Sequence, residues 1–220
     1  MGLFEFVKVS KRYHYEKFDV IKDFDLSIGE GETHTVMLEV QSGKSTLAKL
    51  LTGVIKPTQG EMCFKGESYS FSTHDKGIMY VGEEPLYFKN RSVYFNLAYP
   101  LKIRKCSNTE TGKEINRINA DYNLDLEKKA KNLTPKELCS LLCARGETRK
   151  ISLLVLDGVK GECFERLCAF AEKKKCALLI LTGDIAQAKG RVTVVQNKEI
   201  IYRGDAGGAA QTIQNTLWLT

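Results

Sequence analysis

The chain has 220 residues, of which 43% are hydrophobic and 27% charged, and it carries a formal net charge of +6. This length and composition are typical of one globular domain with a sizeable core. The basic residues are scattered without an aromatic-interleaved motif, which argues against nucleic-acid binding, and the seven cysteines form no Cys-x-x-Cys pair, which argues against a zinc site.

Short β-like runs separated by turns occupy the first third of the chain. The run from Thr33 to Val40 predicts a buried strand. Apolar residues at helical spacing between Leu47 and Val54 predict a helix after it, and the turn from Pro57 to Gly60 ends this helix. In this part of the chain we expect strands at residues 4–9, 19–28, 33–40, 61–65 and 78–81.

The second half begins with a polar, lysine-rich region at residues 89–149, which we interpret as an inserted helical subdomain. The run from Ile151 to Leu156 is almost wholly apolar and ends in Asp157, which is typical of a central parallel strand. In this half we expect helices at residues 110–120, 126–131 and 163–175, a buried strand at 177–181, and a hairpin formed by 192–196 and 199–202.

Gly43, Lys44 and Ser45 lie between a predicted strand and a predicted helix, which matches the second half of a P-loop. In such a loop, backbone amides surround the phosphates, the lysine reaches the β- and γ-phosphates, and the serine hydroxyl binds Mg²⁺. The leading glycine is replaced by Leu38, and Glu39 is expected to place negative charge near the phosphates. Two interpretations remain: the loop still binds nucleotide, or it has lost that ability.

Further segments accompany the P-loop in a fixed order: Phe6–Tyr13, Leu50–Gly53, Lys56–Glu61, Tyr80–Phe88 and Ser92–Lys102. Together they resemble the ATP-binding domain of ABC transporters, and the last two are most similar to importers, including those for carbohydrates. The resemblance implies one α/β domain over residues 1–220. It implies a P-loop NTPase (RecA-like) core with an N-terminal antiparallel β subdomain and an inserted helical subdomain at 89–149.

The resemblance also implies roles for individual residues. Tyr13 would stack on adenine, and the segment after the Q-loop would meet a membrane permease. The nucleotide-binding residues implied are Tyr13, Ser42, Gly43, Lys44, Ser45 and Thr46. The Mg²⁺ ligands implied are Ser45, Glu83 and Asp157, of which Asp157 would act through water.

Several positions depart from the family pattern. The Q-loop glutamine is Glu83, whose carboxylate remains a suitable Mg²⁺ ligand. The glutamate that activates the attacking water should follow Asp157, but Gly158 stands there. General-base help is worth roughly 10²–10⁴-fold in rate, so we expect no catalytic residue and very slow turnover at most. The switch histidine is replaced by Gly183.

The family's signature motif falls at residues 133–137, which read Leu-Thr-Pro-Lys-Glu. Pro135 has no N–H to offer a phosphate, and Lys136 is bulky where glycine permits close approach. Thr134 as N-cap, Pro135 at the first helical position and Glu137 at the third make a well-formed helix start. We therefore expect the Thr134 hydroxyl to cap its own helix rather than bind a phosphate of a partner subunit.

The retained positions concern binding and the lost ones concern hydrolysis. The sequence thus predicts a degenerate nucleotide-binding subunit of an ABC transporter, a pseudo-ATPase with ATP and Mg²⁺ as its cofactors. We expect it to form a heterodimer with an active ATPase subunit, to dock on a membrane permease, and to be cytoplasmic and peripheral on the inner face of the cell membrane. The alternatives are a slow but genuine ATPase that energises import, and a free-standing regulatory or scaffold protein.

Overall fold

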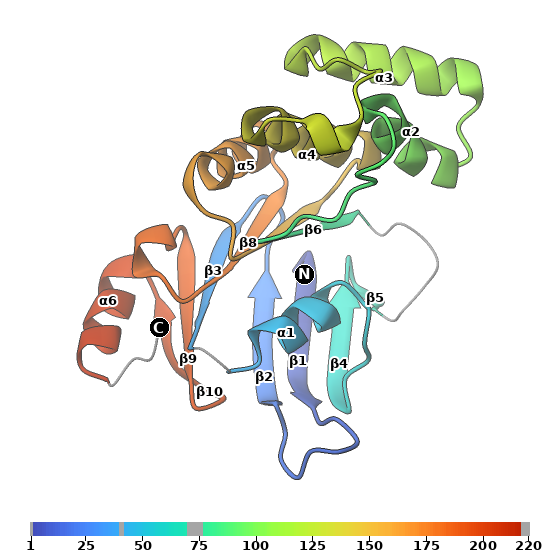
Figure 1. Ribbon diagram of the computed structural model, residues 1–220. Helices are drawn as coiled ribbons and strands as arrows, with labels where there is room; N and C mark the ends of the chain where they lie inside the picture. The colour runs from blue at the N-terminus through green and yellow to red at the C-terminus, as the bar shows by residue number, and fades with distance from the viewer. Residues whose placement is uncertain (1, 40–41, 70–76, 217–220) are drawn as a thin grey trace.

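The computed structural model describes residues 2–39, 42–69 and 77–216, so residue 40 of the predicted strand 33–40 lies outside the described residues. Figure 1 shows the arrangement of the elements. In chain order the elements are β1 (Phe4–Lys11), β2 (Ile21–Ile28), β3 (Thr33–Leu38), α1 (Lys44–Leu51), β4 (Gln59–Phe64), β5 (Glu67–Ser68), β6 (Ile78–Gly82), α2 (Val93–Ile103), α3 (Asn108–Tyr122), η1 (Ala130–Asn132), α4 (Pro135–Arg149), β7 (Leu153–Asp157), α5 (Gly161–Lys174), β8 (Ala177–Thr182), η2 (Ile185–Gln187), β9 (Arg191–Gln196), β10 (Glu199–Gly204) and α6 (Ala206–Gln214).

Two sheets form the body of the molecule. The N-terminal sheet is antiparallel with strand order β2-β1-β4-β5, and the core sheet has the order β10-β9-β3-β8-β7-β6. In the core sheet, β9, β3, β8, β7 and β6 run parallel to their neighbours, and only β10 pairs antiparallel, with β9. The parallel strands are nearly continuous apolar runs because both faces of the core sheet are covered.

Helix α1 is buried where the two sheets pack together. Its residues Leu47, Leu50 and Leu51 are almost fully buried in one cluster with side chains of both sheets. Strand β7 shows the alternation behind this layering, because Leu153 belongs to the α1 cluster whereas Leu154 belongs to the cluster formed with α4 and α5. The strands therefore carry α1 on one face and α4 with α5 on the other.

Helices α2, α3 and α4 form a separate layer between β6 and β7 in the sequence. Figure 1 shows this layer at one end of the molecule, with α3 outermost. Its own apolar cluster includes Leu97, Leu101, Ile115, Ile118 and Leu141. Within residues 2–39, 42–69 and 77–216, the helices are all too short or too polar to cross a lipid bilayer.

The helix predicted for residues 126–131 is wrong. Only the short 3-10 helix Ala130–Asn132 forms there. The backbone before it bonds with the start of α2 instead, since Val93 N donates to the Lys128 carbonyl and Tyr94 N donates to the Leu126 carbonyl, both at 2.9 Å. These inter-segment bonds use the carbonyls that a helix would need.

A buried histidine lies at the seam between the two sheets. The His34 Nε2 hydrogen-bonds with Thr193 Oγ1 at 2.9 Å, and Arg191 Nη2 approaches the His34 Nδ1 at 3.3 Å. Arg191 also donates to the Ser27 carbonyl on β2 and pairs with Glu32 at 2.8 Å. Burial, with a smaller contribution from the positive charge of Arg191, lowers the pKa of His34 from 6.5 to about 4.

The lowered pKa of His34 predicts that the free energy of unfolding falls in acid. As the pH falls below 6.5, the unfolded chain takes up a proton at His34 before the folded chain does, so the stability present above pH 6.5 is lost progressively down to about pH 4. The loss amounts to about 3 kcal/mol at 1.36 kcal/mol per pKa unit. Urea unfolding between pH 7.5 and about pH 4.5 measures it. His34→Gln should flatten the curve, whereas His14→Gln, on an exposed residue, should not. Parallel curves for wild type and His34→Gln would refute this account.

Candidate functional site

The P-loop segment links the end of β3 to the start of α1. Gly43 has a φ of 91°, a left-handed conformation that favours glycine, and an added Cβ would lie 3.0 Å from the Val20 carbonyl oxygen. This conformation lets the chain enter α1 at Lys44. A cavity of about 760 Å³ opens beside the loop, and its lining includes Gly43, Lys44, Ser45 and Thr46.

The Glu39 carboxylate has hydrogen-bond partners outside the phosphate loop, and its effect on bound phosphates stays a prediction. Although Glu39 lines the cavity wall, its carboxylate accepts hydrogen bonds from Gln196 Nε2 at 2.8 Å and from the Asn197 backbone N–H at 3.4 Å. Gln196 is the last residue of β9, and Asn197 begins the turn to β10. The residue therefore ties the end of β3 to this turn, and sequence reasoning missed it because the partners lie about 160 residues away along the chain.

Lys44, at the start of α1, forms an ion pair with Asp157, at the end of β7. The Lys44 Nζ lies 3.1 Å from the Asp157 Oδ1, and the Tyr80 hydroxyl donates to the Asp157 Oδ2 at 2.8 Å. The structure thus brings the predicted P-loop lysine and the predicted acidic residue of β7 together. Tyr80 was not predicted as a site residue. Its backbone lies opposite Val155, two residues before Asp157, and only the pairing of β6 with β7 brings its hydroxyl within reach of the Asp157 carboxylate.

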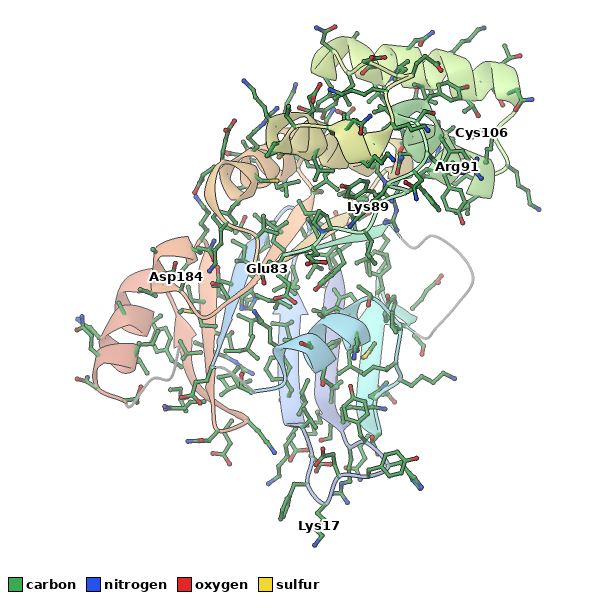
Figure 2. All side chains as sticks on the ribbon, in the orientation of Figure 1. Lys17, Glu83, Lys89, Arg91, Cys106 and Asp184 are labelled. Carbon is green, nitrogen blue, oxygen red and sulfur yellow. The ribbon has the colours of Figure 1, made fainter. Side chains whose placement is uncertain are left out.

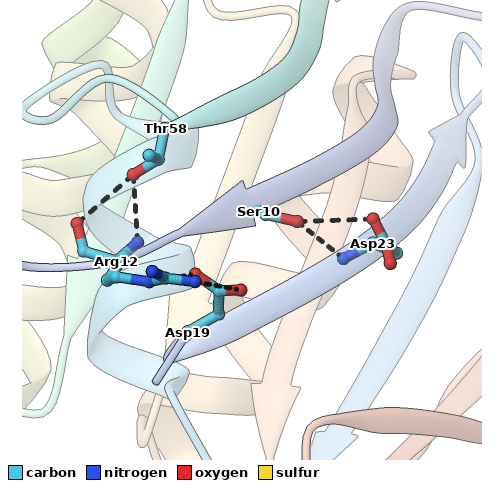
Figure 3. A network of polar contacts seen from close by, with 5 residues as sticks. All are labelled: Ser10, Arg12, Asp19, Asp23 and Thr58. Atoms are coloured by element: carbon cyan, nitrogen blue, oxygen red, sulfur yellow. Dashed lines mark hydrogen bonds and ion pairs between the residues drawn. The ribbon is translucent and has the colours of Figure 1, made fainter. Parts of the chain in front are cut away.

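Tyr13 is positioned by a polar network at the base of the β1–β2 hairpin. Figure 3 shows that Arg12 pairs with Asp19, at 3.0 Å, and that Thr58 Oγ1 accepts a bond from the Arg12 N–H, also at 3.0 Å. The Tyr13 hydroxyl then hydrogen-bonds with Thr46 Oγ1 at 3.2 Å, which joins the aromatic ring to α1. The adenine-stacking role of Tyr13 stays a prediction.

Gly158 follows Asp157 with a φ of 69°, so a side chain here would be strained. A Cβ built on Gly158 would lie 3.6 Å from the Glu83 Cβ and 3.9 Å from the Glu83 Oε2. The Glu83 carboxylate therefore lies beside the space that the family's catalytic glutamate would use. Figure 2 shows Glu83 at the end of β6, between the core sheet and the helical layer.

Gly183 follows β8 in a closely packed position. A Cβ there would lie 3.3 Å from the Leu38 carbonyl oxygen, a tight contact with backbone. Next to it, Thr182 Oγ1 donates to Gln187 Oε1 and Gln187 Nε2 donates to the Val159 carbonyl, both at 2.8 Å. This network joins the segments that follow β7 and β8, and the Asp184 carboxylate is turned away from it to accept the Ala186 N–H at 2.9 Å.

The N-terminus of α4 is capped by side chains of its own first turn. The Glu137 N–H donates to the Thr134 Oγ1 at 3.3 Å, and the Thr134 N–H donates to the Glu137 Oε2 at 2.7 Å, which is the capping box expected from the sequence. Lys128 Nζ adds an ion pair with Glu137 at 2.8 Å. The bonds from Lys128 and Thr134 lower the pKa of Glu137 to about 2. A carboxylate thus occupies the helix terminus that the family uses to bind a partner's phosphate.

Mg²⁺ fits the described geometry poorly. Each carboxylate oxygen of Asp157 already accepts one donor, Lys44 Nζ on Oδ1 and the Tyr80 hydroxyl on Oδ2, so a metal-bound water would compete with these two donors. The roles of Ser45 and Glu83 as metal ligands stay predictions.

Lys160 is a further residue that sequence reasoning missed. It lies in the loop between β7 and α5 and lines the same cavity as Lys44. Among the described residues it has no ion-pair partner. The sequence offered one indication of this residue, because Lys160 lies two positions after Gly158, where the family has its catalytic glutamate.

Comparison with known proteins gives consistent relatives. A family model described as ABC transporter matches residues 21–157. The molybdate/tungstate import ATP-binding protein WtpC of Thermococcus kodakarensis is 28% identical over 146 residues, which are 65% of this chain and 44% of that protein. The sulfate/thiosulfate import ATP-binding protein CysA of Mesorhizobium japonicum is 32% identical over 107 residues, 48% of this chain and 31% of that protein. The chain thus spans less than half the length of these relatives.

Solved structures share the fold along the whole chain. The structure of cbiO1 from Clostridium perfringens, part of the ABC transporter complex cbiONQ, has a TM-score of 0.77 at 18% identity and covers 98% of this chain and 96% of its own. The ADP conformation of MJ1267, an ATP-binding cassette of an ABC transporter, has a TM-score of 0.77 at 17% identity, with 99% and 96% covered. These neighbours confirm the expected P-loop NTPase core with its antiparallel β subdomain and helices.

The capping box at α4 predicts a stability effect. Thr134→Ala removes the side-chain acceptor for the Glu137 N–H and should lower the free energy of unfolding by about 1 kcal/mol, measured by urea denaturation. Thr109→Ala is the matched control, because Thr109 is exposed in the first turn of α3 and is not that helix's N-cap. Equal stabilities of the two variants would contradict the capping role.

Proposed function

Because the chain belongs to the ABC transporter ATP-binding family, we propose that it is a nucleotide-binding subunit of such a transporter with little or no ATP hydrolysis of its own. Members of this family bind ATP together with Mg²⁺ and serve as ATP-binding subunits of transporters. The nucleotide would be held by Tyr13 and residues 42–46. The observation that carries the proposal is position 158, where a left-handed glycine replaces the residue that activates water.

The proposal includes a second, active ATPase subunit. In the family each site combines the P-loop of one subunit with the signature motif of the other. Here Thr134, Glu137 and Lys128 satisfy the start of α4 internally, so this chain would offer little to a triphosphate held by its partner. Both composite sites of a heterodimer would then contain one altered half from this chain, and any turnover would depend on the P-loop and catalytic residues of the other subunit. The chain would then work on the cytoplasmic face of the membrane, peripheral to the permease.

The permease would dock on an aromatic surface at α2. Phe88, Phe95 and Tyr99 pack together with ring centroids 4.8–6.1 Å apart, and Leu86 beside them is 82% exposed. Arg145 Nη1 donates to the Leu86 carbonyl at 2.6 Å, which holds this loop against α4. A fixed, exposed apolar surface with aromatic residues is typical of a protein–protein interface.

A slow but genuine ATPase is the second candidate. The observation in its favour is the Glu83 carboxylate beside Gly158, which returns an acidic group to the region of the lost glutamate. Against it, Glu83 belongs to the end of β6 rather than β7, and the switch position is Gly183. The relatives whose names describe import suggest that either form would serve an importer.

Steady-state phosphate release by the purified chain tests the proposal. We expect release at the background level for wild type and for Lys44→Ala alike. Gly158→Glu alone should not create activity, since its backbone is left-handed and its side chain would meet Glu83. Release by wild type that Lys44→Ala abolishes would overturn the proposal in favour of the slow ATPase.

If a permease docks on this surface, a charged residue in place of the exposed Leu86 should weaken partner binding. Leu86→Asp should reduce co-purification with membrane components from detergent-solubilised membranes by at least about fivefold, as expected for a central interface residue. The matched control is Val54→Asp at the end of α1, because Val54 is also an exposed aliphatic side chain, at 61%. Equal recovery of partners with both variants would remove the docking surface from the proposal.

A further inference from the structure

Asp157 is the acidic residue through which the family holds metal-bound water, but here it is already satisfied. Its side chain is only 11% exposed, and Lys44 Nζ and the Tyr80 hydroxyl bind its two oxygens at 3.1 and 2.8 Å. We propose that the Tyr80 hydroxyl takes the place of a metal-bound water on Asp157, so that this site binds the polyphosphate of a nucleotide without Mg²⁺. The inference rests on the proposed nucleotide binding and deepens it.

The position of Tyr80 depends on a glycine two residues further along β6. Residues 80 and 82 point to the same face of the strand. A Cβ on Gly82 would lie 2.9 Å from the Tyr80 hydroxyl oxygen and 3.1 Å from its ring carbon Cε1. The ring therefore lies over Gly82, in space that any other residue would fill, and this lets the hydroxyl reach Asp157.

Tyr80 remains a donor under ordinary conditions. Burial, and next the bond to Asp157, raise the pKa of Tyr80 well above its ordinary value of 10.0. A neutral phenol can donate one hydrogen bond to the carboxylate, as a metal-bound water would, but it brings no positive charge. The charge that Mg²⁺ would supply to a polyphosphate must then come from side chains.

Two lysines line the cavity where that charge is needed. Lys44 lies at the start of α1, and Lys160 lies in the loop after β7. An ammonium group has three N–H donors, so Lys44 can keep its bond to Asp157 and also donate to a phosphate oxygen. Lys160 has no ion-pair partner among residues 2–39, 42–69 and 77–216. Gly158 places no carboxylate between the two, and Lys160 adds one positive charge to that of the P-loop lysine.

Titration of the full chain with the fluorescent nucleotide mant-ADP, in excess Mg²⁺ and in excess EDTA, tests the inference. The Kd of wild type should differ less than about twofold between the two conditions. Tyr80→Phe and Gly82→Ala each release Asp157 Oδ2, so Mg²⁺ should tighten their binding by about tenfold, the size of one recovered hydrogen bond to a charged group. Lys160→Ala should weaken binding in EDTA by about tenfold, as loss of a charge-assisted hydrogen bond does.

Matched controls separate these effects from general loss of structure. Tyr122→Phe removes a similar bond, from a tyrosine hydroxyl to the Glu147 Oε1 at 2.7 Å, in the helical layer away from the cavity. Lys113→Ala removes an exposed lysine from the middle of α3. Both variants should keep the wild-type Kd in Mg²⁺ and in EDTA.

Three results would overturn the inference. They are a tenfold or greater loss of wild-type affinity on chelation, no nucleotide binding in either condition, and Mg²⁺ independence in Tyr80→Phe and Gly82→Ala as well as in wild type. The phosphate-release assay keeps the two proposals apart. A chain that releases no phosphate but needs Mg²⁺ to bind mant-ADP defeats only the metal-free inference, whereas a chain that hydrolyses ATP defeats the proposed function.

Discussion

The site depends on the alignment of the carboxyl ends of the parallel strands. Backbone pairing sets Gly82 opposite Asp157, Asp157 opposite Leu181, and Met37 opposite Thr182. Because β6, β7, β8 and β3 end in one row, the residues that follow them lie side by side at one edge of the core sheet. The apolar burial of these strands on both faces fixes that register, since a slip by one residue would exchange the two faces. The family's catalytic positions that are altered after these strands, at Glu83, Gly158 and Gly183, therefore lie in one small region.

The residues at these strand ends fit one another. Gly158 adopts a left-handed backbone beside Glu83, Gly183 lies close to the Leu38 carbonyl, and Tyr80 lies over Gly82. An added Cβ at these glycines would contact a neighbour or strain the backbone. These positions are therefore packed together. Replacing Gly158 or Gly183 by the family's residue would strain the backbone or crowd the neighbouring atoms.

The sequence predicted the parts that are governed by local or periodic patterns. The buried strands, the turn at Asn197-Lys198, the P-loop glycine and the capping box at Thr134 each follow from residues close together in the chain. What it missed depends on pairing in space. Tyr80 meets Asp157 across 77 residues, and Glu39 bonds to the β9–β10 turn across more than 150. Residues 126–131 looked helical, but their carbonyls bond to the start of α2, a tertiary contact that local propensity does not contain.

Four acidic groups in and around the site have partners within the chain. Asp157 binds Lys44 and Tyr80, Glu39 binds the β9–β10 turn, Asp184 caps η2, and Glu137 caps α4. Asp157 and Glu39 are buried, and a buried carboxylate without a partner would destabilise the fold, so their contacts help to keep the site formed. An enzyme that turns over must exchange such contacts for those with substrate at each cycle. A subunit whose contribution is shape does not have to, and the internal pairing suits a chain that presents the same surfaces to its partners whether or not nucleotide is bound.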